Sequence, residues 1–240
     1  MSFSEQALLQ LQQGLEQLGV PTTETCMEQL IAYWNLVEQT NQTLNLTRVT
    51  GDAAVTHHLL DAATLIPLLS QHTAQRILDI GTGLGVPGMV LAILMPSSEF
   101  VLLDALDKRI QFLMMVIDRL GLQNVHARHA RAEVVAHEPQ MREQFDSVIS
   151  RAVTALPALI ELSIPFLAIG GTVCAMKGPK VHEELADANI LAPLLGSSPM
   201  QIHQVKVPFL EEERFVISAH KEQATPQTYP RRPKKLGLLK

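Results

Sequence analysis

Cysteine is scarce in this chain, and its scarcity limits the chemistry that the protein can use. Among 240 residues only Cys26 and Cys174 are cysteines, and neither belongs to a paired motif. Two isolated thiols argue against a disulfide framework and against a cysteine-rich zinc site, and they fit a reducing compartment. We therefore expect a cytoplasmic protein without a metal.

Long hydrophobic runs are also lacking. The longest apolar stretches are short or interrupted by proline and glycine, whereas a spanning helix needs about 20 apolar residues. The first residues, MSFSEQALLQLQQGLEQL, are acidic and rich in glutamine, which is unlike a signal peptide. Apolar residues nevertheless make up 47% of the composition. These features predict a soluble globular protein that does not bind membranes.

Positive charge is nearly missing from the first third of the chain. The net charge is −5, and residues 1–75 contain one basic residue, Arg48, against seven acidic ones. Residues 76–240 are close to neutral, and basic residues gather there in YPRRPKK at 229–235. A basic surface that contacts RNA phosphates and an ordinary solvated surface both fit this distribution.

Hydrophobic periodicity divides the chain into three parts. Residues 1–72 show mainly helical spacing, including a helix around 53–69, and are expected to form a helical extension packed on the core. Residues 73–220 alternate short apolar strands with helices, and residues 221–240 are a proline-rich basic tail that lies on the surface or is mobile. The expected strands are 76–80, 100–104, 124–128, 146–150, 172–177, 200–207 and 214–220.

The order of these elements predicts an α/β fold. Strands that alternate with amphipathic helices form a mostly parallel, doubly wound sheet. The last two strands have no long helix between them, so we expect them to form an antiparallel hairpin at one edge. The complete sheet would then have seven strands.

A glycine-rich turn, RILDIGTGLGVPG at 76–88, follows the first strand of this sheet. Gly81, Gly83 and Gly85 allow a sharp turn and a close approach to a ligand. Asp104 ends the second strand 19 residues after Gly85, where its carboxylate can accept hydrogen bonds from ribose hydroxyls. Folds that bind NAD and folds that bind S-adenosylmethionine share these features.

Asp79 distinguishes between the two cofactors. It precedes the first glycine of the loop by two residues, and a carboxylate at that place would repel a pyrophosphate. The ammonium and sulfonium groups of S-adenosylmethionine would be attracted instead. The spacing GxGxG also differs from the GxGxxG of dinucleotide sites. The sequence therefore predicts S-adenosylmethionine as the cofactor.

Missing motifs restrict the methyl acceptor. The fourth strand lacks a following (Asp/Asn)-Pro-Pro-aromatic run, which methyltransferases of exocyclic amines usually carry, and both cysteines are expected to be buried hydrophobic residues rather than nucleophiles. A ring nitrogen such as guanine N7 needs neither device, because its lone pair is already free. A small molecule or a protein as acceptor, and a cofactor-sensing ribosome-binding protein without turnover, remain alternatives.

Several stretches occur in the order and spacing of one known family: NLT (45–47), HHLLD (57–61), RILDIGTGLGVPG, FVLLDALDKRIQFL, ARAE (130–133), FDSVISRAV and AMKG (175–178). In these stretches the chain resembles RsmG, or glucose-inhibited division protein B, the bacterial 16S ribosomal RNA guanine-N7 methyltransferases. The resemblance implies a Rossmann-like class I methyltransferase. It also implies methyl transfer from S-adenosylmethionine to N7 of a guanine in the 530 loop of 16S rRNA, on free rRNA or on the small ribosomal subunit.

The resemblance also implies roles for individual residues. Gly81 and Gly83 would line the methionine moiety, and Val86 would contact the cofactor from the start of the next helix. Asp104 would hold the ribose, while Ala132 and Glu133 would lie beside the adenine. Arg151 would be catalytic at the boundary between cofactor and substrate; from the residues alone, a structural ion pair is an equally good interpretation.

Four other basic residues are candidates for RNA contacts: Lys108, Arg109, Arg131 and Lys177. The cluster of His57, His58 and Asp61 suggests a metal site, but neighbouring histidines on a helix face different directions. We therefore expect a hydrogen-bonded structural role for this cluster and no metal ion. The protein is expected to act as a monomer.

Overall fold

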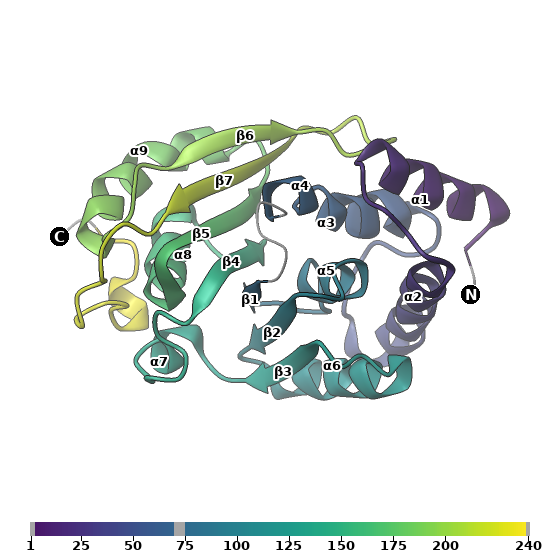
Figure 1. The fold of residues 1–240 in the computed structure, drawn as a ribbon, viewed down its shortest axis with the longest axis horizontal. Helices are drawn as coiled ribbons and strands as arrows, with labels where there is room; N and C mark the ends of the chain where they lie inside the picture. Colours follow the sequence, from purple (N-terminus) through teal and green to yellow (C-terminus); the bar gives the residue numbers. More distant parts are fainter. Residues whose placement is uncertain (1–2, 70–74, 239–240) are drawn as a thin grey trace.

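The centre of the computed structural model, which describes residues 3–69 and 75–238, is a seven-stranded sheet (Figure 1). The strand order is β3-β2-β1-β4-β5-β7-β6. The first five strands are parallel, and β7 is antiparallel to both β5 and β6. The strands are β1 (Arg76–Ile80), β2 (Glu99–Asp104), β3 (Val125–His129), β4 (Phe145–Arg151), β5 (Leu167–Lys177), β6 (Gln201–Val205) and β7 (Arg214–His220).

This topology confirms the predicted fold class and all seven predicted strands. The largest difference is β5, which begins at Leu167 instead of residue 172. The sheet grows outward from β1 in both directions, first toward β3 and then toward β6. The chain thus changes direction in the sheet at the carboxyl ends of β1 and β4, which is where ligands of such sheets bind.

Helices cover both faces of the sheet and enclose two separate hydrophobic cores (Figure 1). One core includes side chains of α1 (Glu5–Gln17), α2 (Glu24–Leu44), α5 (Gly88–Leu94) and α6 (Asp107–Leu120). The other includes side chains of α7 (Ala132–Val135), α8 (Leu156–Ser163), η2 (Ile164–Phe166), α9 (Val181–Leu191) and η3 (Ala192–Leu195). Helix α6 buries one apolar stripe toward β2 and β3, whereas α1 and α2 pack on other helices.

The amino-terminal helices cap one end of the molecule. Ser4 and Thr23 cap α1 and α2 by accepting hydrogen bonds from backbone amides. The expected helix around 53–69 is not continuous: it consists of a π-helix, η1 (Val55–Leu60), followed by the short helices α3 (Asp61–Ala63) and α4 (Ile66–Leu69). The proposed boundary at residues 72 and 73 lies outside the described residues.

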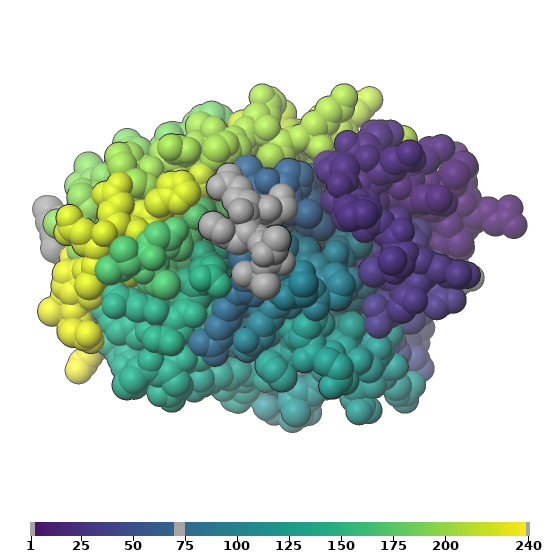
Figure 2. Space-filling view, viewed as in Figure 1, coloured from purple at the N-terminus to yellow at the C-terminus, as the bar shows by residue number. Residues whose placement is uncertain are grey.

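The carboxy-terminal tail lies along the surface, as one of the two alternatives predicted, and buried contacts anchor it. In Figure 2 its yellow atoms rest against the green part of the chain. The Arg142 guanidinium donates hydrogen bonds to the carbonyls of Thr225, Pro226 and Tyr229. Arg231 forms an ion pair with the fully buried Glu161 at 2.7 Å. The tail also contains the short helix η4 (Pro233–Lys235).

Candidate active site

The glycine loop between β1 and α5 adopts the sharp turn that its sequence predicts. Gly81, Gly83 and Gly85 all have positive φ, and the value of +106° at Gly85 is one that other residues rarely adopt. A Cβ atom on Gly85 would also approach Leu113 Cδ2 to 2.8 Å. The third glycine is therefore required by backbone conformation and by space.

Two carboxylates at strand ends hold this loop from within. Asp79 Oδ2 accepts hydrogen bonds from Thr82 Oγ1 at 2.7 Å and from the Gly88 amide at 2.9 Å. Asp104 Oδ2 accepts from the Gly83 amide at 2.9 Å. The structure thus brings together the loop and both acids that the sequence predicts around the cofactor.

The carboxyl group of Asp79 is buried with fewer hydrogen-bond partners than its oxygens can accept. The residue is completely buried, and burial raises the pKa of its carboxyl to about 7, against lowering contributions from its hydrogen bonds to Thr82 and Gly88. Its Oδ1 atom has no hydrogen-bond partner among the described residues. A buried acceptor without a partner is unusual in a folded protein. The ammonium group of S-adenosylmethionine is a donor of the required charge, so the residues present fit this cofactor.

Asp104 has a second set of contacts on the loop before α6. Its Oδ1 accepts from the Leu106 amide at 2.8 Å, and its Oδ2 lies 3.3 Å from Arg109 Nη1. The Arg109 side chain, predicted to bind RNA, is therefore paired with the acid predicted to hold the ribose. Lys108, its neighbour, is exposed.

The remaining residues that were predicted to contact the cofactor lie at the beginnings of α5 and α7. Val86 is buried in the core just before α5. Ala132 and Glu133 begin α7, with Arg131 as the preceding cap residue. The Glu133 side chain is largely buried, whereas the Arg131 side chain is 69% exposed. Arg131 Nη1 lies 3.8 Å from Glu133 Oε1, and the cofactor roles of Val86, Ala132 and Glu133 stay predictions.

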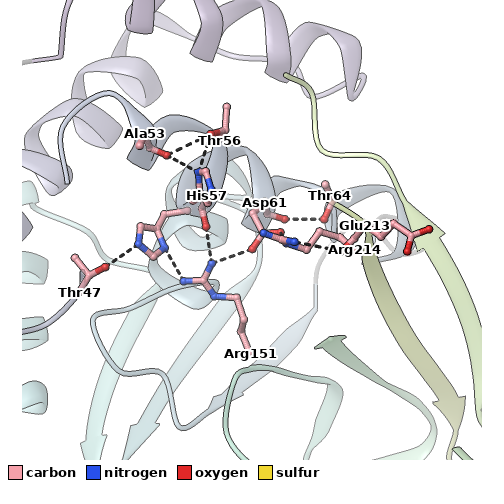
Figure 3. Close-up of polar contacts among 10 residues, drawn as sticks. Thr47, Ala53, Thr56, His57, Asp61, Thr64, Arg151, Glu213 and Arg214 are labelled. Atoms are coloured by element: carbon pink, nitrogen blue, oxygen red, sulfur yellow. Dashed lines mark hydrogen bonds and ion pairs between the residues drawn. The ribbon is translucent and has the colours of Figure 1, made fainter. Parts of the chain in front are cut away.

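Arg151 occupies a socket made by the amino-terminal extension, as Figure 3 shows. Its Nη1 donates to the His57 carbonyl and to Asp61 Oδ2, both at 2.9 Å, and its Nη2 donates to His58 Nδ1 at 2.7 Å. The structural ion pair considered from sequence is therefore present. Arg151 also lines the neighbouring cavity.

His58 is held in one tautomer by this arrangement. Because its Nδ1 accepts from Arg151, its Nε2 carries the proton and donates to Thr47 Oγ1 at 3.0 Å. The Trp34 ring lies 5.1 Å from the imidazole, measured between centroids. Burial, followed by the charge of Arg151, lowers the pKa of His58 to about 3. The expected hydrogen-bonded role is confirmed for this histidine, which stays neutral at physiological pH.

A cavity of about 340 Å³ opens beside Arg151 at the carboxyl ends of β4 and β5. Lys177 lines it, and its Nζ bonds to the Thr154 carbonyl and to Glu184 Oε2 at 2.7 and 2.9 Å. Arg214 also lines it, with its Nε 3.5 Å from Asp61 Oδ1 (Figure 3). Asp61 thus lies between two guanidinium groups, and its buried carboxylate links the cavity to the socket of Arg151.

Sequence reasoning missed Arg214 and the importance of Asp61. Arg214 begins β7, which is antiparallel to β5, so its first residue lies at the edge where the parallel strands end. That inference was available once the hairpin was predicted. The pairing of Asp61 with Arg151 joins residues 90 positions apart, and no local pattern signals it.

Neither cysteine is placed to act as a nucleophile. Cys174 is buried in β5, where burial raises the pKa of its thiol to about 12. Cys26 is half-buried on α2, and its thiol donates to the Ile93 carbonyl. Within residues 3–69 and 75–238 no cluster of three or more His, Cys, Asp or Glu side chains could hold a metal ion, and no helix of these residues could cross a membrane.

Comparison with known proteins points to one family. The family model GidB, described as rRNA small subunit methyltransferase G, matches residues 26–215. A ribosomal RNA small subunit methyltransferase G from Pelotomaculum thermopropionicum is 37% identical over 93% of this chain and 94% of its own length. The protein of the same name from Lachnoclostridium phytofermentans is 38% identical over 95% and 96%.

Solved structures share the fold. An O-methyltransferase from Bacillus cereus in complex with SAH matches 87% of this chain and 96% of its own, with a TM-score of 0.59 and 20% identity. A predicted O-methyltransferase from Agrobacterium tumefaciens matches 70% of this chain and 81% of its own, with a TM-score of 0.53 and 21% identity. At these identities the likeness establishes the Rossmann-like methyltransferase fold.

Proposed function

Because the chain belongs to the GidB family of small-subunit ribosomal RNA methyltransferases, we propose that it transfers the methyl group of S-adenosylmethionine to N7 of a guanine in the 530 loop of 16S rRNA. The substrate is the 16S rRNA or the small ribosomal subunit, and the enzyme works in the cytoplasm, where its substrate is assembled. The observation that supports the cofactor is the buried Asp79 Oδ1 without a partner among the described residues, and the rRNA acceptor rests on the family match.

Each part of the loop would contribute to holding the cofactor. Asp79 would receive the ammonium group, and Asp104 would accept hydrogen bonds from the ribose hydroxyls, exchanging part of its contact with Arg109. Gly81 and Gly83 would line the methionine moiety, while Ala132 and Glu133 begin α7, beside which the adenine would rest. The cofactor supplies an electrophilic methyl group on a sulfonium.

The cavity beside Arg151 would receive the guanine. Arginine side chains recognise the O6 edge of guanine and RNA phosphates, and Arg151 and Arg214 both line this cavity. Attack by N7 forms the N–CH₃ bond and breaks the S–CH₃ bond, and no proton is removed. The protein therefore needs to position the base and exclude water, and no side chain has to act as a general base. Arg151, fixed by three acceptors, is the residue that would position the base against the methyl group.

Methyl transfer from labelled S-adenosylmethionine tests this function directly. The substrates are 30S subunits and naked 16S rRNA from cells that lack this gene, and the modified base is mapped by cleavage at 7-methylguanine. Label at guanine N7 in the 530 loop supports the proposal, and the preferred substrate shows when in assembly the enzyme acts. Label on another base or atom would replace the proposed acceptor.

Two variants locate the reaction in the described site. R151M removes the three hydrogen bonds of the guanidinium and should lower kcat by at least about 100-fold, the size typical for loss of one positioning group. R119K changes an exposed arginine in the last turn of α6 and should leave kcat unchanged. Full activity of R151M, with correct folding, would remove Arg151 from the reaction and leave it the structural ion pair.

A further inference from the structure

Helix α2 of the amino-terminal extension contacts the glycine loop directly. Tyr33 Oη donates a hydrogen bond to the Leu84 carbonyl at 2.9 Å, and the two residues are 51 positions apart in the chain. Tyr33 is fully buried and Leu84 is 8% exposed. A helix outside the sheet thus supplies a partner for the backbone of the loop that would hold the cofactor.

The hydroxyl group fits closely against the top of the loop. A Cβ atom on Gly85 would lie 3.2 Å from Tyr33 Oη, so the glycine leaves the space that the hydroxyl occupies. On the inner side, Asp79 binds the Thr82 hydroxyl and the Gly88 amide, and Asp104 binds the Gly83 amide. The loop backbone is therefore fixed by side chains from β1, β2 and α2.

From these contacts we infer that Tyr33 is a positioning residue for S-adenosylmethionine: its hydroxyl holds the Leu84 carbonyl so that the glycine loop keeps the shape that receives the cofactor. The inference rests on the proposed function, since it concerns the cofactor site of that reaction. Tyr33 does not touch the reacting atoms and acts through the loop.

Burial of the ring alone does not require the hydroxyl group. A phenylalanine would fill the same apolar space between α2 and α5, and it would avoid burying a polar oxygen. Burial also raises the pKa of the Tyr33 hydroxyl far above its usual range, so the group keeps its proton and can donate a hydrogen bond at neutral pH. What the oxygen adds to the ring is the bond to Leu84.

Trp34, the next residue of α2, lies beside the residues that hold Arg151. Trp34 packs on His58, which accepts the hydrogen bond from Arg151, and the Tyr33 and Trp34 rings are nearly perpendicular at 83°. Consecutive residues of one helix thus support the cofactor loop and the arginine socket.

The test is the affinity of full-length Y33F for S-adenosylmethionine, measured by isothermal titration calorimetry. We expect Kd to rise about tenfold, equivalent to about 1.4 kcal/mol, because the loop loses a bond that the bound shape requires. In methyl transfer, KM for S-adenosylmethionine should rise by a similar factor. KM for 30S subunits should stay unchanged, and so should kcat at saturating cofactor.

S147A is the matched control for general destabilisation. The buried Ser147 hydroxyl donates to Gln75 Oε1 at 2.7 Å, at the opposite, amino-terminal edge of the sheet. Its loss should lower the melting temperature by an amount similar to that in Y33F and leave the Kd unchanged. Equal cofactor affinity of Y33F and the wild type, or an equal loss in S147A, would overturn the inference. Failure of the wild type to bind the cofactor would instead overturn the proposed function.

The wild-type protein offers a second test that stands even if Y33F does not fold. The chain has two tyrosines, so a protein labelled with ¹³Cζ-tyrosine gives two resonances. Tyr33 belongs to the core with the loop, and Tyr229 packs on the opposite core under the Arg231 guanidinium. Addition of S-adenosylmethionine should shift the Tyr33 resonance and leave that of Tyr229 in place. A Tyr33 resonance that does not move at saturating cofactor would contradict the inference.

Discussion

At the scale of single residues, the buried Asp79 carboxylate lowers the stability of the folded protein and at the same time favours binding of a cationic cofactor. In the unfolded chain its carboxyl titrates near 3.8, and in the folded protein burial raises the pKa to about 7. The folded state therefore binds the proton more tightly than the unfolded state. The contribution of Asp79 to the free energy of unfolding therefore falls as the pH rises from about 4 through 7, and it levels off above that range. Without the cofactor, the buried Asp79 carboxylate therefore destabilises the folded protein, at the place where the cationic cofactor is to bind.

D79N should make the protein more stable at pH 8 and weaker in cofactor binding. An asparagine oxygen can still accept from Thr82 and Gly88, while the buried charge is gone. We expect the free energy of unfolding at pH 8 to rise by an amount on the order of 1–4 kcal/mol, and little change at pH 4. The Kd for S-adenosylmethionine should rise by at least about tenfold, since the ammonium group loses its counter-charge.

Urea unfolding at pH 4 and pH 8, with calorimetric titration of the cofactor at pH 8, measures both effects. The difference in stability between D79N and the wild type should be small at pH 4 and larger at pH 8. A variant that is less stable than the wild type at pH 8 would show that hydrogen-bond geometry, and not charge, governs this position.

At the scale of elements, the sequence was most informative where neighbouring residues decide the structure. The seven strands, α6 and the loop at 81–85 follow from apolar runs, helical spacing and glycines, and all are present. The π-helix η1 was not predictable in the same way. Its geometry presents the His57 carbonyl and the His58 ring to Arg151, and these contacts exist only after the chain has folded.

The tail illustrates the same limit. Its prolines and charges resemble those of a mobile segment, yet Arg231 pairs with a glutamate 70 positions earlier. Burial tends to raise the pKa of Glu161, but hydrogen bonds from Arg231 and from the Gly237 amide lower it overall. The carboxylate therefore stays ionised at neutral pH. Of the basic residues in YPRRPKK, Arg231 forms the ion pair with Glu161, and Arg232, Lys234 and Lys235 are exposed.

We expect substitutions in the tail to separate into two kinds. R231M leaves the Glu161 charge buried without its main partner and should destabilise the protein by about 3–5 kcal/mol. The triple variant R232Q/K234Q/K235Q should change stability by less than about 0.5 kcal/mol. It should weaken RNA binding and flatten its salt dependence if the tail contacts phosphates.

Urea unfolding and filter binding of 16S rRNA at several salt concentrations measure these outcomes. Equal stability of R231M and the wild type would mean that the ion pair does not anchor the tail. An unchanged salt slope in the triple variant would exclude the tail from the RNA interface.

At the scale of the whole molecule, the net charge of −5 conceals an uneven distribution. Basic side chains from separate segments meet at the carboxyl edge of the sheet, because parallel strands end there and β7 begins there. They are Lys108, Arg109, Arg131, Arg151, Lys177 and Arg214. Acids of the same edge pair with most of these side chains, so the positive charge that the edge can offer to RNA depends on the cations that stay exposed.

The cations of this edge are not equivalent, and their contacts predict which ones reach RNA. Arg109 and Lys177 are paired with Asp104 and Glu184, whereas Lys108 is exposed and Arg131 is 69% exposed with its nearest acid 3.8 Å away. We expect K108Q and R131Q each to weaken RNA binding and to reduce the slope of log K against log salt concentration by about 0.7–0.9, the value for one lost phosphate contact. The Kd for S-adenosylmethionine should not change.

R119Q is the control. It removes an exposed positive charge at the end of α6, at the other edge of the sheet, and should leave the slope unchanged. A slope that changes equally in all three variants would mean that RNA senses only the net charge, and the carboxyl edge would then lose its place as the RNA-binding surface.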